Sequence, residues 1–208
     1  MARQRVGIAV FLATVLLAAN AAAQKNEIAG SIGRVFISDQ GVQGANPANP
    51  NIHFGDGLSY EVNYARTFLN TGVFSINAEI PFVITPTAEL NFGQNIVPKS
   101  FRSYFITPAA RVNLFPTTAF SPWVSVGGGF GHFGESSELE FGGANPGKTG
   151  TTTGVFQAGF GLDVKIISAF KLRGEVRDFY SGVPQLNAVT GKTRQHNYFA
   201  GGGVVFSF

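Results

Sequence analysis

Histidines are the first residues to consider for chemistry, because an imidazole beside a hydroxyl and a carboxylate can carry out acyl transfer. The chain has three, His53, His132 and His196. Glu135, Ser136 and Ser137 follow His132 closely and would supply an acid and a hydroxyl. No local motif of an acyl-transferring enzyme surrounds them, so the sequence predicts no catalytic residue and no metal-ligand set.

Two segments match nucleotide-binding patterns by letter, GGANPGKT at 142–149 and GFGHFG at 129–134. Both patterns work only when a helix follows, because the phosphate rests on the amides of a helix N-terminus. The first segment runs into a Gly/Thr-rich loop, and the second lies in a glycine-rich strand-like stretch. Neither has its helix, and the sequence predicts no cofactor.

Charged residues on the strand-like segments form a more informative group. They share the polar face of those segments and comprise the acids Glu61, Glu79, Asp163 and Glu175 and the bases Arg111, Lys171, Arg173 and Arg177. Charges that share a confined space are stable only when they pair. We therefore expect these eight side chains to form one ion network.

The segments that carry these charges alternate apolar and polar residues, the pattern of a strand whose two faces differ. The clearest are GLSYEVNYARTF at 57–68 and VFSINAEIPFVI at 73–84, which the turn LNTG joins. Four more segments alternate less cleanly, at 103–114, 153–164, 169–180 and 196–208. Residues 26–38 and 122–133 are also strand-like, but their pattern assigns them no face.

Alternation also occurs in soluble β-sandwiches, so strand length and the order of short and long loops decide between a sandwich and a membrane barrel. The predicted strands are about 10 to 12 residues long, close to what a tilted strand needs to cross a bilayer. Short turns alternate with long polar loops at 39–56, 86–102, 134–152 and 182–195, as in outer-membrane barrels. The sequence predicts an all-β fold, a closed antiparallel transmembrane β-barrel of about eight strands. Such a barrel is just wide enough for side chains, so the ion network would plug its lumen.

Aromatic residues concentrate at the predicted strand ends, where they suit the bilayer interface. On this basis Trp123 is assigned to the periplasmic belt of aromatic residues and Phe133 to the outer belt. Pro81 and Pro108 fall inside predicted strands, where a proline removes a donor from the ladder of hydrogen bonds. We expect them to mark bulges.

The N-terminal 23 residues have the organisation of a signal peptide. Arg3 and Arg5 precede an apolar run from Val6 to Ala19, and small residues lie before Gln24. The run is shorter than the roughly 20 residues of a membrane anchor. Residues 1–23 are therefore predicted to be cleaved, and residues 24–208 to form one barrel domain. No apolar run beyond Gln24 is long enough for a spanning helix.

Charge and cysteine content exclude other classes. Arg3 and Arg5 account for two of the 15 basic residues, which leaves the rest close to balance with the 12 acidic residues. With 13% charged residues and no basic run, the chain lacks the footprint of a nucleic-acid-binding protein. With no cysteine, it has neither disulfides nor thiolate chemistry.

The C-terminal segment NYFAGGGVVFSF resembles the terminal strand of the small outer-membrane β-barrel family, the OmpA, OmpX and OmpW-like group. The resemblance covers residues 24–208, and GVFQAGFGLDVKI with FKLRGEVRDFY resembles that family's last central hairpin. It implies an assembly signal read by the barrel assembly machinery, carried by Tyr198, Val204, Phe206 and Phe208. Gly202 and Ala200 depart from the usual larger side chains of that signal.

The family shares a scaffold and no single activity, so the functional expectation is broad. We expect a monomeric, non-enzymatic protein of the bacterial outer membrane, in contact with its lipid and lipopolysaccharide, with a structural or surface-interaction role. A narrow channel for small or apolar solutes is the first alternative, and a lipid-modifying enzyme is the second.

Overall fold

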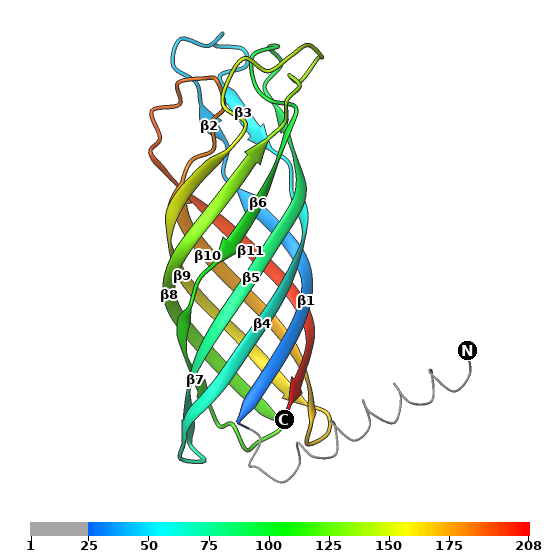
Figure 1. The fold of residues 1–208 in the computed structure, drawn as a ribbon, viewed down its shortest axis with the longest axis vertical. Helices are drawn as coiled ribbons and strands as arrows, with labels where there is room; N and C mark the ends of the chain where they lie inside the picture. The colour runs from blue at the N-terminus through cyan, green and yellow to red at the C-terminus, as the bar shows by residue number, and fades with distance from the viewer. Residues whose placement is uncertain (1–24) are drawn as a thin grey trace, which may run out of the picture.

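Antiparallel strands make up most of the computed structural model, which describes residues 25–208 (Figure 1). The predicted signal peptide, residues 1–23, lies outside the described residues. The strands are β1 (Asn26–Ile37), β2 (Gln40–Gly41), β3 (Asn51–Phe54), β4 (Gly57–Asn70), β5 (Phe74–Asn91), β6 (Ser100–Ile106), β7 (Ala109–Leu114), β8 (Phe120–Glu135), β9 (Thr151–Lys165), β10 (Phe170–Gly182) and β11 (Arg194–Ser207). Residues 25–208 contain no helix long and apolar enough to cross a membrane.

The strands close into a ring. Each pairs antiparallel with its neighbour in the order β1, β4, β5, β6 with β7, β8, β9, β10 and β11. β11 then pairs with β1, from Glu27 opposite Ser207 to Ile37 opposite Asn197. β6 and β7 run end to end between β5 and β8 and so count as one member of the ring. The predicted closed antiparallel barrel of eight strands is confirmed.

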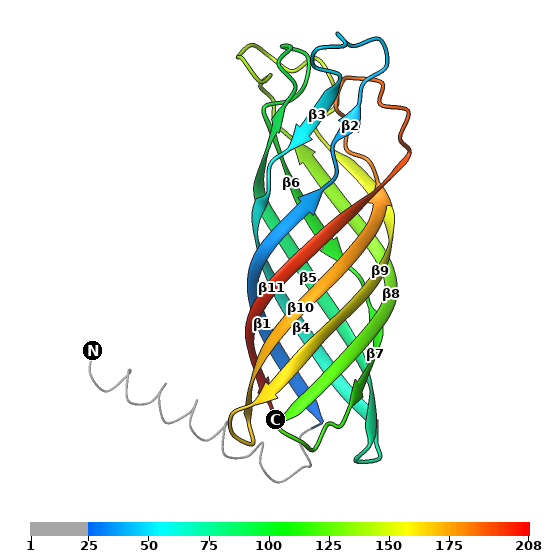
Figure 2. The same cartoon turned by 180° about the vertical axis from the view of Figure 1, so that it is seen from behind.

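Long connections gather at one end of the barrel and short turns at the other (Figures 1 and 2). The short turns lie beside the C-terminus and the start of β1. The long loops carry β2 and β3, and β3 extends the sheet at β5. In an outer-membrane barrel, the short turns face the periplasm and the long loops face outside. These ends are called the periplasmic end and the external end below.

The two prolines fit the wall without the predicted bulges. Pro108 lies in the gap between β6 and β7, and the pairing has the same register on both sides of that gap. Pro81 pairs with Asn63 in an unbroken run of β5. The carbonyl oxygens of both prolines still accept backbone hydrogen bonds. Thr107 N donates to Pro81 O at 3.3 Å, and Gly128 N donates to Pro108 O at 3.1 Å. The register shifts lie elsewhere, between Thr67 and Leu69 and between Thr85 and Ala88.

Side chains alternate between an apolar outer face and the barrel interior. The outer face exposes large apolar residues from every member of the ring, including Ile32, Val62, Ile80, Leu114, Val126, Phe160, Leu172 and Val204. A water-soluble protein rarely exposes so large an apolar band, whereas a barrel in lipid requires one. The outer face is therefore built to contact lipid.

The structure also assigns faces to the two segments that the alternation left open. In β1, Glu27, Ala29 and Ser31 point inward, while β8 directs Trp123 and Phe133 inward. The prediction that these two aromatic residues join interfacial belts is wrong, because Trp123 is 2% exposed and Phe133 is 0% exposed. Both pack inside the barrel instead.

Candidate functional site: the closed interior

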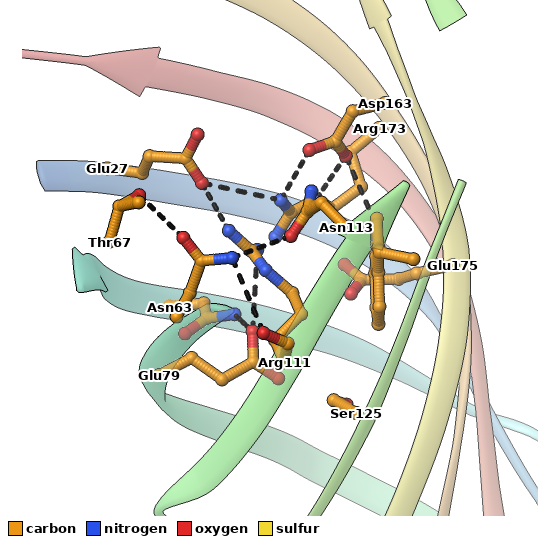
Figure 3. A network of polar contacts seen from close by, with 12 residues as sticks. Glu27, Asn63, Thr67, Glu79, Arg111, Asn113, Ser125, Asp163, Arg173 and Glu175 are labelled. Atoms are coloured by element: carbon orange, nitrogen blue, oxygen red, sulfur yellow. Dashed lines mark hydrogen bonds and ion pairs between the residues drawn. The ribbon is translucent and has the colours of Figure 1, made fainter. Parts of the chain in front are cut away.

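The periplasmic half of the interior is filled with charged side chains (Figure 3). All eight residues of the expected network point inward, and all but the half-buried Lys171 are buried. They come from β4, β5, β7, β9 and β10, so the closed ring is what brings them together.

Arg177 lies at the centre of the acidic side chains. Its Nη1 donates to Glu79 Oε1 at 2.8 Å, and its Nε donates to Glu175 Oε2 at 3.0 Å. The same Nε lies 3.1 Å from Glu61 Oε2. Among the described residues, neither carboxylate oxygen of Glu61 accepts a hydrogen bond. One guanidinium thus contacts three carboxylates, and it is the group on which this part of the network most depends.

Arg173 forms a two-bond pair with Asp163, and its Nη2 also lies 4.0 Å from Glu27 Oε2. Its Nε and Nη2 donate to the two carboxylate oxygens of Asp163 at 2.8 and 2.9 Å. Two parallel bonds from a planar guanidinium fix its direction as well as its charge. This pair ties β10 to β9, which are neighbours in the ring.

Glu27 is a member of the network that the sequence analysis missed. Its carboxylate accepts hydrogen bonds from Arg111 and from Lys171, and it lies beside Ser207 at the closing seam. Arg111 Nη1 also reaches Glu79 Oε2 at 3.4 Å, which links this group to Arg177. A signal was present, since Ile28 and Ile32 point outward on the opposite face of β1, but Gly30 and Gly33 obscured it.

Trp123, the only tryptophan of the chain, is the second missed member. Its ring lies 5.0 to 5.7 Å from the guanidinium carbons of Arg111, Arg173 and Arg177. Its Nε1 donates to Asp163 Oδ1 at 3.2 Å. Gly161 lies against the ring, and a Cβ there would come within 2.6 Å of it. The indole thus provides three cations with a π face at the centre of the network.

Neutral amides continue the network toward the periplasm. Asn77 Nδ2 donates to Asn113 Oδ1 at 2.9 Å, and Thr67 Oγ1 donates to Asn77 Oδ1 at 2.5 Å. Beyond them a polar cavity of about 240 Å³, lined in part by Glu27 and Lys171, opens at this end. The periplasmic mouth is therefore polar, and the network closes its inner end.

The external half of the interior holds a buried apolar cluster, with buried polar side chains such as Ser59, Gln195 and Asn197 around it. The buried members of the cluster come from the strands and from the external loops and are Val35, Ile52, Val83, Ala88, Leu90, Phe92, Val97, Phe101, Phe105, Phe133, Val155, Phe179, Leu186 and Phe199. Phe105 and Phe179 stack at 4.8 Å with nearly parallel rings. The sequence analysis predicted an ionic plug alone, whereas this apolar cluster forms a second plug above it.

The histidines make contacts at the outer rim. His53 pairs with Asp39 and His196 with Asp178, both at 2.6 Å, while His132 contacts Thr152 Oγ1 at 2.9 Å. Among residues 25–208, no imidazole hydrogen-bonds a serine, and no group of three potential metal ligands occurs.

The C-terminal residues close the seam at its periplasmic end. Phe208 and Asn26 exchange two backbone hydrogen bonds, of 2.8 and 3.0 Å. Phe206 packs against Phe170 and Phe208, with centroids 5.1 and 5.8 Å away. Tyr198 and Val204 face outward on the same strand.

Solved structures with the same architecture are outer-membrane proteins. Neisserial surface protein A is 12% identical, with a TM-score of 0.54 over 88% of this chain and 97% of that one. OprG of Pseudomonas aeruginosa is 10% identical, with a TM-score of 0.56 over 89% and 96%. The N-terminal barrel domain of OprF, from the same bacterium, is 13% identical, with a TM-score of 0.50 over 89% and 98%. No protein-family model and no curated protein matches the chain. Likeness at this identity establishes the fold, that of the small outer-membrane β-barrels.

Proposed function

We propose that this chain is an outer-membrane barrel with a closed interior that acts through its outer and external surfaces. Export through a cleaved signal peptide, insertion by the barrel assembly machinery and a monomeric state in contact with lipid and lipopolysaccharide are parts of this proposal. The apolar outer face and the likeness of fold support it. Its role is structural or is surface interaction within the envelope.

The observation that carries the proposal is the double closure of the interior. The periplasmic half holds ion pairs around Arg177, and the external half holds an apolar cluster that includes loop residues such as Phe92 and Leu186. A solute path would have to separate buried charges and also displace packed aromatic rings. A buried charge left without its partner is destabilising, by about 3 to 5 kcal/mol when the partner is removed by mutation. A barrel with a closed interior and long loops at its external end is suited to presenting those loops as a surface outside the membrane.

Conductance in a planar lipid bilayer tests this proposal. The wild-type barrel is expected to show little or no steady conductance. Glu79→Ala or Arg173→Ala removes one partner of a buried pair, so water is expected to enter and at least one of the two variants to conduct more. Arg66→Ala, a change at an exposed arginine of β4, is the matched control and should behave as the wild type. Large, stable openings from the wild type would overturn the proposal in favour of a solute channel.

A further inference from the structure

A small pocket lies at the external end of the seam between β1 and β11, which are neighbours in Figure 2. Its volume is about 210 Å³, and it is lined by Ser38, Asp39, Gln40, Lys192, Arg194, Gln195 and His196. The chain leaves β1 and enters β11 at this point. Beneath it, Gln40 Nε2 donates to Gln195 Oε1 at 2.8 Å, which joins the two segments.

His196 is a fixed wall of this pocket. Its Nδ1 is 2.6 Å from Asp178 Oδ2, its ring lies 4.8 Å from that of Tyr180, and it stacks on Tyr198 with planes 5° apart. A neutral imidazole that donates from Nδ1 to the carboxylate keeps Nε2 as an acceptor. The aromatic neighbours hold the ring in place, so the direction of Nε2 is set before any ligand arrives.

The pocket has two cationic side chains, Lys192 and Arg194. Within residues 25–208, neither Lys192 nor Arg194 forms an ion pair. Arg194 Nη1 donates to Gly154 O at 3.2 Å, which anchors the guanidinium and leaves its other donors free. The two nearby carboxylates each contact a histidine, Asp39 with His53 and Asp178 with His196. The site therefore suits an anion that accepts several hydrogen bonds.

The height of the pocket on the barrel points to the source of that anion. Directly below it, Phe36 of β1 and Tyr198 of β11 are register partners, and both rings face outward. Further down, the outward positions on β11 and β10 include the small residues Ala200, Gly202 and Gly174, with Val176 of β10 and Arg34 of β1 on either side of Ala200. An acyl chain lying on these small residues would bring its headgroup to the level of Lys192, Arg194 and His196.

We propose that this pocket binds the phosphate of an outer-leaflet lipid headgroup, with Lys192 and Arg194 as donors and the ring of His196 as a fixed wall. The inference rests on the proposed location in the outer membrane and assigns a site to the lipid contact. Phosphate matches the site because its oxygens accept charge-assisted hydrogen bonds from ammonium and guanidinium groups together.

Native mass spectrometry of the detergent-solubilised barrel tests the site, with diphosphoryl lipid A and the same lipid after removal of its phosphates as probes. The wild type is expected to retain the phosphorylated form at least about five-fold better. The double variant Lys192→Gln, Arg194→Gln should lose this preference. Lys99→Gln, Lys148→Gln removes the same charge from exposed loop positions and should keep it.

Three outcomes would overturn the proposal. They are equal retention of both lipids by the wild type, equal loss of preference in both double variants, and full displacement by inorganic phosphate at the lipid's concentration, which would mark a site for free anions. Gly174→Leu adds a side chain where a Cβ meets nothing within 4 Å. It should weaken retention of the lipid, because it covers the surface on which the acyl chain would lie. Failure of the closed-interior proposal would be seen separately, as wild-type conductance in the bilayer.

Discussion

The two halves of the barrel interior are closed by different interactions, ion pairs in the periplasmic half and apolar packing in the external half. Around Arg177 and Trp123, closure depends on which atoms face each other, because each buried charge needs an opposite charge within reach. Around Phe105 and Phe179, closure depends on volume, because dispersion and burial of apolar surface have no fixed direction. The charged half should therefore tolerate few substitutions, and the apolar half should tolerate any that preserve size and apolarity.

Removal of the central cation should have the largest effect. Arg177→Met keeps an unbranched chain but leaves Glu61, Glu79 and Glu175 without that guanidinium, and we expect a loss of about 3 to 5 kcal/mol in the free energy of unfolding. Urea titration in lipid vesicles measures it. Arg66→Met, an exposed position on β4, is the control and should change stability little. Equal stability of the Arg177 variant and the wild type would remove the distinction between the halves.

A charge on the lipid-facing surface should rank second. Ile80→Arg places a cation on the outward face of β5 near the middle of the apolar band, at an expected cost of about 2 to 4 kcal/mol. Phe68→Arg lies near the periplasmic turn and should cost about 1 kcal/mol or less. The same unfolding titration ranks the two. The reverse order would mean that the membrane lies at another height on the barrel.

Conservative changes should separate the halves with the smallest effects. Phe105→Leu keeps much of the buried volume in the apolar cluster and should cost less than about 1.5 kcal/mol. Arg177→Lys keeps the charge but replaces a planar group with several donors by a single ammonium, so it should cost more than the leucine change. Equal costs for the two variants, or a larger cost for Phe105→Leu, would mean that the charged half does not depend more than the apolar half on the chemical identity of its side chains.

Sequence alone was sufficient for the fold and for most of the charged half. In β4 and β5, Glu61, Asn63 and Glu79 alternate with outward Val62, Tyr64 and Ile80, and this contrast marks both strand and face.

The apolar half was not predictable in the same way. Phe105 lies between Tyr104 and Ile106, so both faces of β6 are apolar and alternation carries no contrast. Ile52 reaches the interior from β3, a strand of four residues that is too short for alternation to mark a face, and Leu186 reaches it from a loop. The position of Trp123 near a strand end favours an interfacial belt, but the polar residues Ser121 and Ser125 alternate in phase with it and indicate an inward face.

Acrylamide quenching of Trp123 fluorescence tests the closed interior most directly, because the chain has one tryptophan and its ring lies 2% exposed at the centre of the charged half. For the folded barrel in lipid vesicles, we expect a quenching constant several-fold below that of the urea-unfolded chain. We also expect it to rise in Arg173→Ala, which removes the partner of Asp163 beside the indole. Quenching of the folded wild type as strong as that of the unfolded chain would contradict a closed interior.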